Sequence, residues 1–204
     1  MYNIRTKDLG EAWFESMKLV LSSGQDFYDG DIKLKEIRNL YVSIEDIDEH
    51  AEILEKYADR SRIELMKKKY FTCGLVGDYK IDYGSYIFNN NGVNQFEWLY
   101  ERLKNKPETK SATIVMHVPG EENLTCLSML DFKLRDDKLY MTAVYRSQNI
   151  YASQPGNLVA LRNLQKALAE KLEVNVGGVE LVVMSAHIYE NNYDAANKII
   201  DELS

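Results

Sequence analysis

The sequence is poor in the residues and segments that mark several protein classes. Its 204 residues include only two cysteines, Cys73 and Cys126, and three prolines. Two cysteines cannot build a disulfide framework, and this pair lacks the close spacing of metal ligands, so we expect no metal site. Long apolar runs are absent, and residues 1–7 lack the hydrophobic stretch of a signal peptide. We therefore expect a cytoplasmic protein that does not contact membranes.

Positive charge is also in short supply. The chain carries 25 Lys and Arg against 32 Asp and Glu, a formal net charge of -7. A surface of this kind offers no broad basic field for nucleic acid or for anionic lipid. Any phosphate group must therefore be bound by a few placed side chains rather than by a basic surface.

The composition and the hydrophobic patterning of the chain are typical of one globular domain. Hydrophobic residues make up 45% and charged residues 28%, and no Pro-, Gly- or Ser-rich linker interrupts residues 1–204. Apolar spacing predicts helices at 8–23, 46–69 (one or two), 93–103, 157–172 and 193–203, and strands at 34–44, 111–118 and 179–189. This mixture indicates an α/β or α+β fold in a single domain.

The segment from Cys126 to Ser147 is predicted to be a β-hairpin that turns at Asp136 and Asp137. With that turn, Leu130 faces Ala143 and one side of the hairpin is apolar along its whole length. The same register places Cys126 opposite Ser147 and Ser128 opposite Tyr145. A cysteine and the Tyr145-Arg146-Ser147 segment then lie at one edge of the sheet, although regular alternation directs Arg146 to the face opposite Cys126.

The individual candidates each allow a purely structural interpretation. Cys126 suits a small buried hydrophobe, yet a guanidinium such as Arg146 nearby would stabilise the reactive thiolate. His187 ends an apolar strand, where a hydrogen-bonded core histidine is the more frequent finding. Asn157 suits the N-cap of the helix that follows it. The residues alone therefore indicate an α/β domain with one suspect thiol.

Several motifs together resemble the thymidylate synthase family of nucleotide C5 methyl- and hydroxymethyltransferases. Cys126 stands twenty residues before Arg146, the interval that separates the family's nucleophile from its phosphate-binding arginine. The segment from Cys126 onward looks most like the short archaeal-type members, and Tyr83-Gly84 matches a Tyr-Gly motif of the family. The other matching motifs are Tyr145-Arg146-Ser147-Gln148-Asn149, Gln154-Pro155-Gly156-Asn157 and Ser185-Ala186-His187-Ile188-Tyr189.

The resemblance implies a set of roles around a pyrimidine nucleoside monophosphate, with deoxyuridylate (dUMP) the favoured substrate. The cysteine would add to C6 of the base and make C5 nucleophilic. A lysine lent by the other subunit of a homodimer, built through the sheet, would add charge at the phosphate. The implied residues are Cys126 (nucleophile), Tyr83 (proton removal at C5), Arg146 and Ser147 (phosphate), Asn157 (uracil), His187 and Tyr189 (sugar hydroxyl) and Lys110 (partner's phosphate).

The family also implies a one-carbon donor, 5,10-methylenetetrahydrofolate or a related reduced pterin. Asn149 occupies the place of an aspartate that contacts the pterin ring. The segment 22–31 contains no arginine, where the family has one. The family's catalytic glutamate could correspond to Glu45, Glu49 or Glu52. These departures leave two alternatives open, a nucleotide hydroxymethylase and a non-catalytic nucleotide-binding or interaction protein on the same fold.

Overall fold

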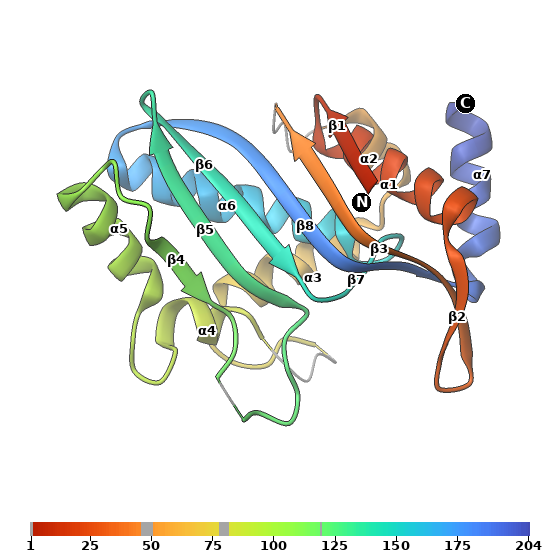
Figure 1. Ribbon diagram of the computed structural model, residues 1–204, viewed down its shortest axis with the longest axis horizontal. Coiled ribbons are helices and arrows are strands. Elements are labelled where there is room, and N and C mark those ends of the chain that lie inside the picture. Colours follow the sequence, from red (N-terminus) through yellow and green to blue (C-terminus); the bar gives the residue numbers. More distant parts are fainter. Residues whose placement is uncertain (1, 46–50, 78–81, 119) are drawn as a thin grey trace.

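One mixed β-sheet with helices packed against it makes up the computed structural model (Figure 1), which describes residues 2–45, 51–77, 82–118 and 120–204. The α+β class and the single domain with a mixed sheet are confirmed. The helices are α1 (Leu9–Ser23), α2 (Glu52–Tyr57), α3 (Arg60–Phe71), α4 (Gly84–Asn89), α5 (Gln95–Asn105), α6 (Gln154–Leu172), the 3-10 turn η1 (Glu190–Asn192) and α7 (Tyr193–Leu203). The strands are β1 (Tyr2–Thr6), β2 (Gln25–Asp29), β3 (Ile32–Ile44), β4 (Ala112–Val115), β5 (Leu127–Arg135), β6 (Lys138–Tyr145), β7 (Gln148–Asn149) and β8 (Asn175–Tyr189).

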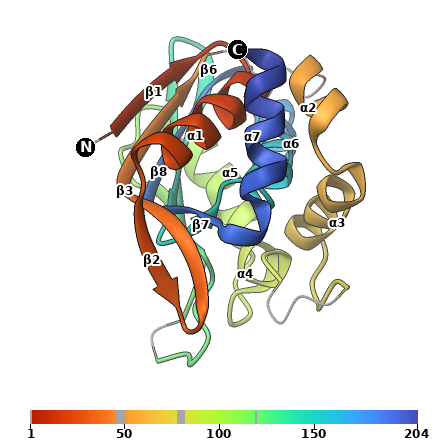
Figure 2. The same cartoon turned by 90° about the vertical axis from the view of Figure 1, so that its right-hand side faces the viewer.

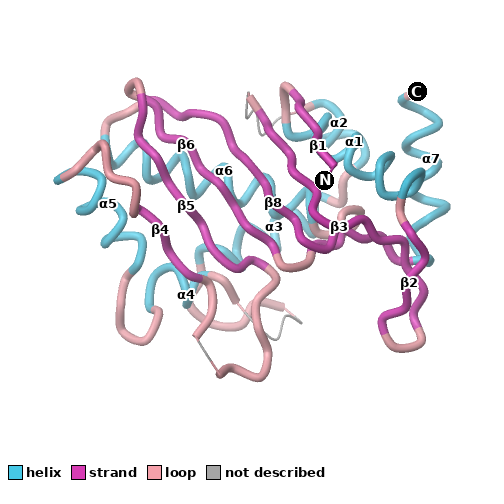
Figure 3. The backbone as a smooth tube through the Cα atoms, in the orientation of Figure 1, coloured by secondary structure: helices cyan, strands magenta, loops and turns pink. Residues whose placement is uncertain are grey.

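The strand order brings the ends of β6 and β8 together. The sheet runs β1-β3-β8-β6-β5-β4, with β2 paired to β3 and β7 paired to β8. Strands β6 and β8 are parallel and lie side by side (Figure 3), so β6 ends at the edge of the sheet towards which β8 continues, from Val183 beside Tyr145 on to Tyr189. Strand β5 is antiparallel to β6 and therefore begins at that edge. The residues around 126, 146 and 187 meet there for this reason.

The helices lie on one face of the sheet, which Figure 2 shows nearly edge-on. Helices α1, α3 and α6 contribute fully buried side chains to this layer, among them Trp13, Tyr70 and Leu164. The indole Nε1 of Trp13 donates to the backbone oxygen of Ile150 at 3.0 Å, which ties α1 to the loop after β7. No helix in the described ranges covers the opposite face. None of the described helices combines the length and the apolar character of a membrane span.

Most predicted helices are found with shifted ends. The helix at 8–23 is confirmed as α1, with the Asp8 side chain accepting from the backbone N–H groups of Gly10 and Glu11. Helix α6 begins three residues earlier than predicted because Pro155 fits its first turn, where a backbone N–H is not needed. Asn157 therefore lies inside the first turn and is not the N-cap. Residues 46–50 of the predicted helical segment 46–69 lie outside the described ranges.

The predicted hairpin is confirmed at its turn and wrong at its open end. Asp136 and Asp137 both have positive φ, and Leu130 does face Ala143. A β-bulge between Leu127 and Met129 then shifts the register, so Leu127 rather than Ser128 faces Tyr145. The bulge allows both Leu127 and Tyr145 to be fully buried.

The bulge also changes what stands opposite the cysteine. The predicted pair of Cys126 with Ser147 is wrong, because the backbone N–H of Arg146 donates to the Cys126 oxygen at 2.9 Å. Directly opposed residues project to the same face of a sheet. The one-residue shift therefore brings Cys126 opposite Arg146, and both side chains are exposed.

Candidate active site

The arginine at the sheet edge holds the segment that carries the cysteine. Arg146 Nε donates to the oxygen of Thr125 at 2.9 Å, and its Nη2 donates to the oxygen of Leu124 at 2.8 Å. These bonds use two of the five guanidinium N–H groups, and the exposed head can direct others towards an anion. Cys126 is exposed, so the interpretation of it as a buried hydrophobe is wrong. Ser147 follows, half-buried, immediately before β7.

Asn157 takes part in a buried hydrogen-bonded cluster with two tyrosines. The Tyr70 hydroxyl donates to Asn157 Oδ1 at 3.3 Å and lies 2.7 Å from the Tyr145 hydroxyl. Both tyrosines are fully buried and Asn157 is nearly so. Burial raises the pKa values of Tyr70 and Tyr145 well above 10.0, so both hydroxyls carry their protons at neutral pH. Tyr145, at the end of β6, thus links the sheet edge to Asn157 through Tyr70.

Tyr83 packs against this cluster from the loop before α4. Its ring meets the Tyr70 ring edge-on, with centroids 4.8 Å apart. The Nζ atom of Lys69 lies 4.2 Å from the centre of the Tyr83 ring. A side chain on Gly84 would put its Cβ 2.2 Å from the backbone oxygen of Thr72, so only glycine allows this loop to pack so closely. In the Tyr83-Gly84 motif, the glycine is therefore required for the close packing of this loop.

Lys69 is a buried cation that the sequence did not single out. Burial lowers its pKa, and the negative charges of Cys126 and Asp82 oppose that shift. Burial is likewise the largest cause of the raised pKa values of Tyr70, Tyr145 and Tyr189, and the Cys126 charge contributes to each. The thiol is therefore within electrostatic range of all four groups.

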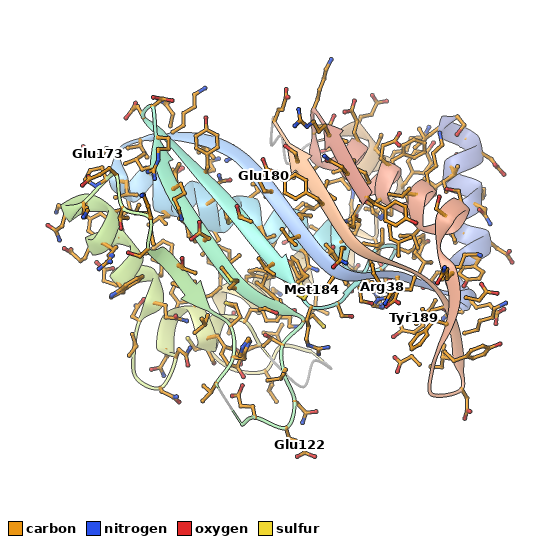
Figure 4. All side chains as sticks on the ribbon, in the orientation of Figure 1. Arg38, Glu122, Glu173, Glu180, Met184 and Tyr189 are labelled. Carbon is orange, nitrogen blue, oxygen red and sulfur yellow. The ribbon has the colours of Figure 1, made fainter. Side chains whose placement is uncertain are left out.

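His187 and Tyr189 lie on β8 where it passes β7 and the base of the β2–β3 hairpin (Figure 4 labels Tyr189). Their rings meet nearly at right angles, with centroids 5.1 Å apart. Burial lowers the pKa of His187 below 6.5, so the imidazole is neutral at pH 7. The Tyr189 hydroxyl donates to Asp29 Oδ2 at 2.9 Å, and burial together with this bond raises its pKa to about 12.

A cavity of about 560 Å³ adjoins this part of the sheet edge. Its lining is mixed, with aromatic rings beside amide, carboxylate and guanidinium groups. The lining includes Trp13, Tyr57, Asp59, Arg62, Asn149, Tyr151, Tyr189 and Asn192. The side-chain oxygen of Asn149 accepts from the backbone N–H of Ala152 at 3.0 Å, which directs its amide nitrogen away from that turn. Such a space suits a planar ring with polar edges.

Lys110 is not brought to the site of its own chain. It is exposed before β4, whose first residue Ala112 pairs with Phe132 on β5. Cys126 precedes the opposite end of β5. The two residues therefore lie at opposite ends of the strand pair, and Lys110 could act only on another subunit. In the described ranges, no three His, Cys, Asp or Glu residues gather in a metal-binding arrangement.

Neither of the two described glutamate candidates is joined to the site. Glu45 follows β3 at the end where Ile44 pairs with Val179, whereas the site lies at the His187 end of β8. Glu52 is exposed at the start of α2. Glu49 lies outside the described residues.

Three residues of the site, Asp29, Lys69 and Tyr70, were not predicted from the sequence. Asp29 and its neighbour Gly30 had a detectable signal, because Asp-Gly marks a hairpin turn. Tyr70 had a weaker one, since it stands one helical turn after Met66 on the face of α3 that packs on α6. Lys69 had none, because a lysine in the run Lys67-Lys68-Lys69 is expected to be solvated.

Comparisons with known proteins show which proteins this chain is similar to. The family model described as thymidylate synthase matches residues 25–203. A candidate thymidylate synthase of Methanosarcina mazei is 30% identical over 97% of this chain and 94% of its own length. A second, from Methanothermobacter marburgensis, is 30% identical over 98% of both chains. A deoxyuridylate hydroxymethyltransferase of Bacillus phage SP01 is 30% identical over 60% of this chain and 33% of that protein.

The buried, neutral His187 should make stability depend on pH. As pH falls below 6.5, the unfolded chain binds a proton at this histidine that the folded protein does not, so the free energy of unfolding should decrease. In His187→Gln this contribution is absent, and the slope between about pH 5 and pH 7 should be smaller by up to about 1.4 kcal/mol per pH unit. Urea unfolding of both proteins across that range measures the slopes. Equal slopes would contradict a depressed pKa for His187.

Proposed function

The chain belongs to the thymidylate synthase family, and we propose that it transfers a one-carbon unit to C5 of a pyrimidine nucleoside monophosphate, with dUMP as the substrate. The proposal rests above all on one observation, the exposed Cys126 thiol at the edge where Arg146 is bonded to the same segment. Nucleophile and anion-binding group then lie a short distance apart, as a small phosphorylated substrate requires. The sequence relation to candidate thymidylate synthases supports the same reaction.

In this mechanism the Cys126 thiolate forms a bond to C6 of the base, and the electron pair of the C5–C6 double bond makes C5 nucleophilic. C5 forms a bond to the one-carbon unit as the bond from that carbon to one pterin nitrogen breaks. The C5 proton then leaves, and the electron pair of that C–H bond expels the second pterin nitrogen and leaves an exocyclic methylene group on C5. A hydride from the reduced pterin adds to this methylene carbon, the C5–C6 double bond re-forms, and the thiolate leaves C6. Tyr83 stands near enough to the cluster to take part in that proton transfer through water. The Lys69 ammonium lies over the Tyr83 ring and interacts electrostatically with Cys126, so it places a positive charge beside the reacting base.

The substrate's sugar and phosphate have matching groups. Arg146 and Ser147 bind the phosphate through N–H and O–H donors. The Tyr189 proton is donated to Asp29, so its oxygen is left to accept from the sugar 3′-hydroxyl. The neutral His187 supplies a second polar contact to the same hydroxyl. Asp29 is thereby a positioning residue for Tyr189.

The cavity beside Asn149 fits the cosubstrate, 5,10-methylenetetrahydrofolate or a related reduced pterin. Rings such as Tyr57 and Tyr151 would lie along a pterin, and Arg62 would pair with an acidic tail. The bound pterin supplies the one-carbon unit. With its oxygen held by Ala152, Asn149 offers amide N–H groups to the ring, where an aspartate would offer an acceptor.

The helix-free face of the sheet is proposed as the interface of a homodimer. Tyr41, Val182, Val144 and Met129 form a half-buried, largely apolar row across four adjacent strands. An isologous dimer would cover this row. Lys110 cannot reach the phosphate site of its own chain, so in the dimer it would contact the phosphate bound by the other subunit. The same proposal places the protein in the cytoplasm, without nucleic acid or membrane partners.

Hydroxymethylation is the second candidate reaction. It shares the cysteine adduct and the one-carbon transfer, but water rather than hydride completes the product. The similarity to the phage deoxyuridylate hydroxymethyltransferase favours this candidate. A non-catalytic nucleotide binder is the third alternative, and the Asn149 replacement is the observation that supports it. Product analysis by mass spectrometry separates the three.

The thiol chemistry predicts a selective covalent adduct. Incubation with 5-fluorodeoxyuridylate and a reduced folate should leave a mass adduct on Cys126, because fluorine at C5 prevents the elimination that frees the enzyme. Cys73 is also exposed and provides the internal control, since it should stay unmodified. Cys126→Ser should reduce turnover by at least about 10³-fold and keep nucleotide binding, whereas Cys73→Ser should do neither. Labelling of both cysteines, or of none, would refute the catalytic proposal.

The cosubstrate site predicts a gain of function. Asn149→Asp keeps an oxygen for the Ala152 N–H and replaces the amide N–H₂ with a charged acceptor for pterin N–H groups. Folate affinity, measured by calorimetry with dUMP already bound, should increase by about tenfold. Asn192→Asp, which adds the same charge elsewhere on the cavity wall, is the matched control. Equal effects of the two substitutions would show that Asn149 does not contact the ring.

The sheet interface predicts a dimer at micromolar concentration in sedimentation experiments. Val182→Glu should convert it to a monomer, because the new carboxylate would be desolvated in the middle of the interface. Val93→Glu changes an exposed valine between α4 and α5, outside the sheet, and should leave the dimer intact. A wild-type monomer would exclude any role of Lys110 at a neighbouring phosphate site.

A further inference from the structure

An asparagine that hydrogen-bonds to a pyrimidine base does not by itself discriminate uracil from cytosine. Uracil presents an N–H donor at N3 and an oxygen acceptor at position 4, and cytosine presents the reverse pattern. The Asn157 amide carries one acceptor and one donor group, so a rotation of 180° about its last bond would match it to either base. Discrimination therefore requires a neighbour that holds the amide in one orientation.

Tyr70 is placed to be that neighbour. Its hydroxyl is 3.3 Å from Asn157 Oδ1, in a site where Tyr70 is fully buried and Asn157 is 3% exposed. A carbonyl oxygen can only accept, so Tyr70 donates its single proton to Asn157. The 2.7 Å bond between the two tyrosines must then be donated by Tyr145. The protons run in one direction, from Tyr145 to Tyr70 to Asn157.

The opposite direction would leave a buried donor without a partner. If the Asn157 amide rotated, its nitrogen would donate to Tyr70, and Tyr70 would donate to Tyr145. The Tyr145 proton would then need another acceptor, and the structure gives Tyr145 no hydrogen-bond partner besides Tyr70 in the described ranges. An unpaired buried hydroxyl is costly. Burial also raises the pKa values of both tyrosines, so neither loses its proton to relieve the conflict.

Helix packing fixes Tyr70 in this position. Helix α3 lies close to α6 because residue 156 is glycine, and a Cβ there would be 2.7 Å from the Cβ of Met66. Met66 stands one helical turn before Tyr70, and Gly156 immediately precedes Asn157. The edge-on contact of Tyr83 holds the ring from another side. The hydroxyl therefore meets the amide through two rigid elements.

We propose that Tyr70 is a specificity-determining positioning residue, which holds the Asn157 amide in the orientation that accepts from uracil N3 and donates to O4. The inference rests on the proposed function, since it assumes that a pyrimidine nucleotide binds at Asn157. It assigns the preference for uracil to a residue that never touches the base.

The test is the ratio of the dUMP and dCMP (deoxycytidylate) dissociation constants, measured by calorimetry. The wild type should prefer dUMP, and Tyr70→Phe should reduce that preference by about tenfold, because the amide becomes free to rotate. Tyr145→Phe is the matched control. It removes the same tyrosine–tyrosine bond but keeps the Tyr70 bond to Asn157, so the preference should persist.

A second comparison separates positioning from general damage. A carboxylate has two equivalent oxygens and no orientation to lose, so in an Asn157→Asp background the Tyr70→Phe change should leave the base ratio unaltered. If Tyr70→Phe does not fold, nuclear Overhauser effects in the labelled wild type decide. The Asn157 Nδ2 protons should lie far from the Tyr70 ring, and a strong signal between them would overturn the proposal.

The outcomes distinguish this inference from the proposed function. An unchanged preference in Tyr70→Phe, or an equal loss in Tyr145→Phe, overturns the role of Tyr70 while nucleotide binding stands. A wild type that binds dUMP and dCMP with equal affinity also overturns the role of Tyr70, while nucleotide binding stands. A wild type that binds neither nucleotide and forms no Cys126 adduct overturns both.

Discussion

The parallel pairing of β6 with β8 is the constraint on which the candidate site depends. Parallel strands end at one edge of a sheet, so the residues after Tyr145 meet the last residues of β8. Strand β5 starts at the same edge because it pairs with β6 in the antiparallel direction. The bulge at Leu127 then brings Cys126 opposite Arg146. Without both features, the Cys126 thiol and the Arg146 guanidinium would not meet at this edge.

Around that edge, the polar side chains are held by the protein before any ligand arrives. Arg146 bonds the backbone oxygens before the cysteine, Tyr189 bonds Asp29, and Asn149 bonds the turn at Ala152. Each of these side chains still has a further donor or acceptor atom for a ligand. Pre-positioned groups lose little conformational entropy on binding. The site therefore combines a thiol with polar groups whose directions are already set.

The local sequence by itself determined the elements and much of the identity of the site. Apolar periodicity located α1 and the core of α6, and the turn residues Asp136 and Asp137 located the hairpin, because both signals depend on neighbours in the chain. The spacing of Cys126 and Arg146 pointed to the family, since such intervals are preserved when strands pair in one register. The short strand β1 was missed, as an edge strand of five residues has little periodicity to detect.

Only the tertiary structure decided how the site residues contact one another. The bulge could not be predicted, because regular alternation buries Ser128 as readily as Leu127, and only packing against the helices selects the leucine. The contacts of Lys69 and Tyr70 depend on the approach of α3 to α6, which brings together residues far apart in the chain. Hydrogen bonds between such residues depend on distances of a few tenths of an ångström. The residue order therefore specified which groups are available, and long-range packing specified which of them meet.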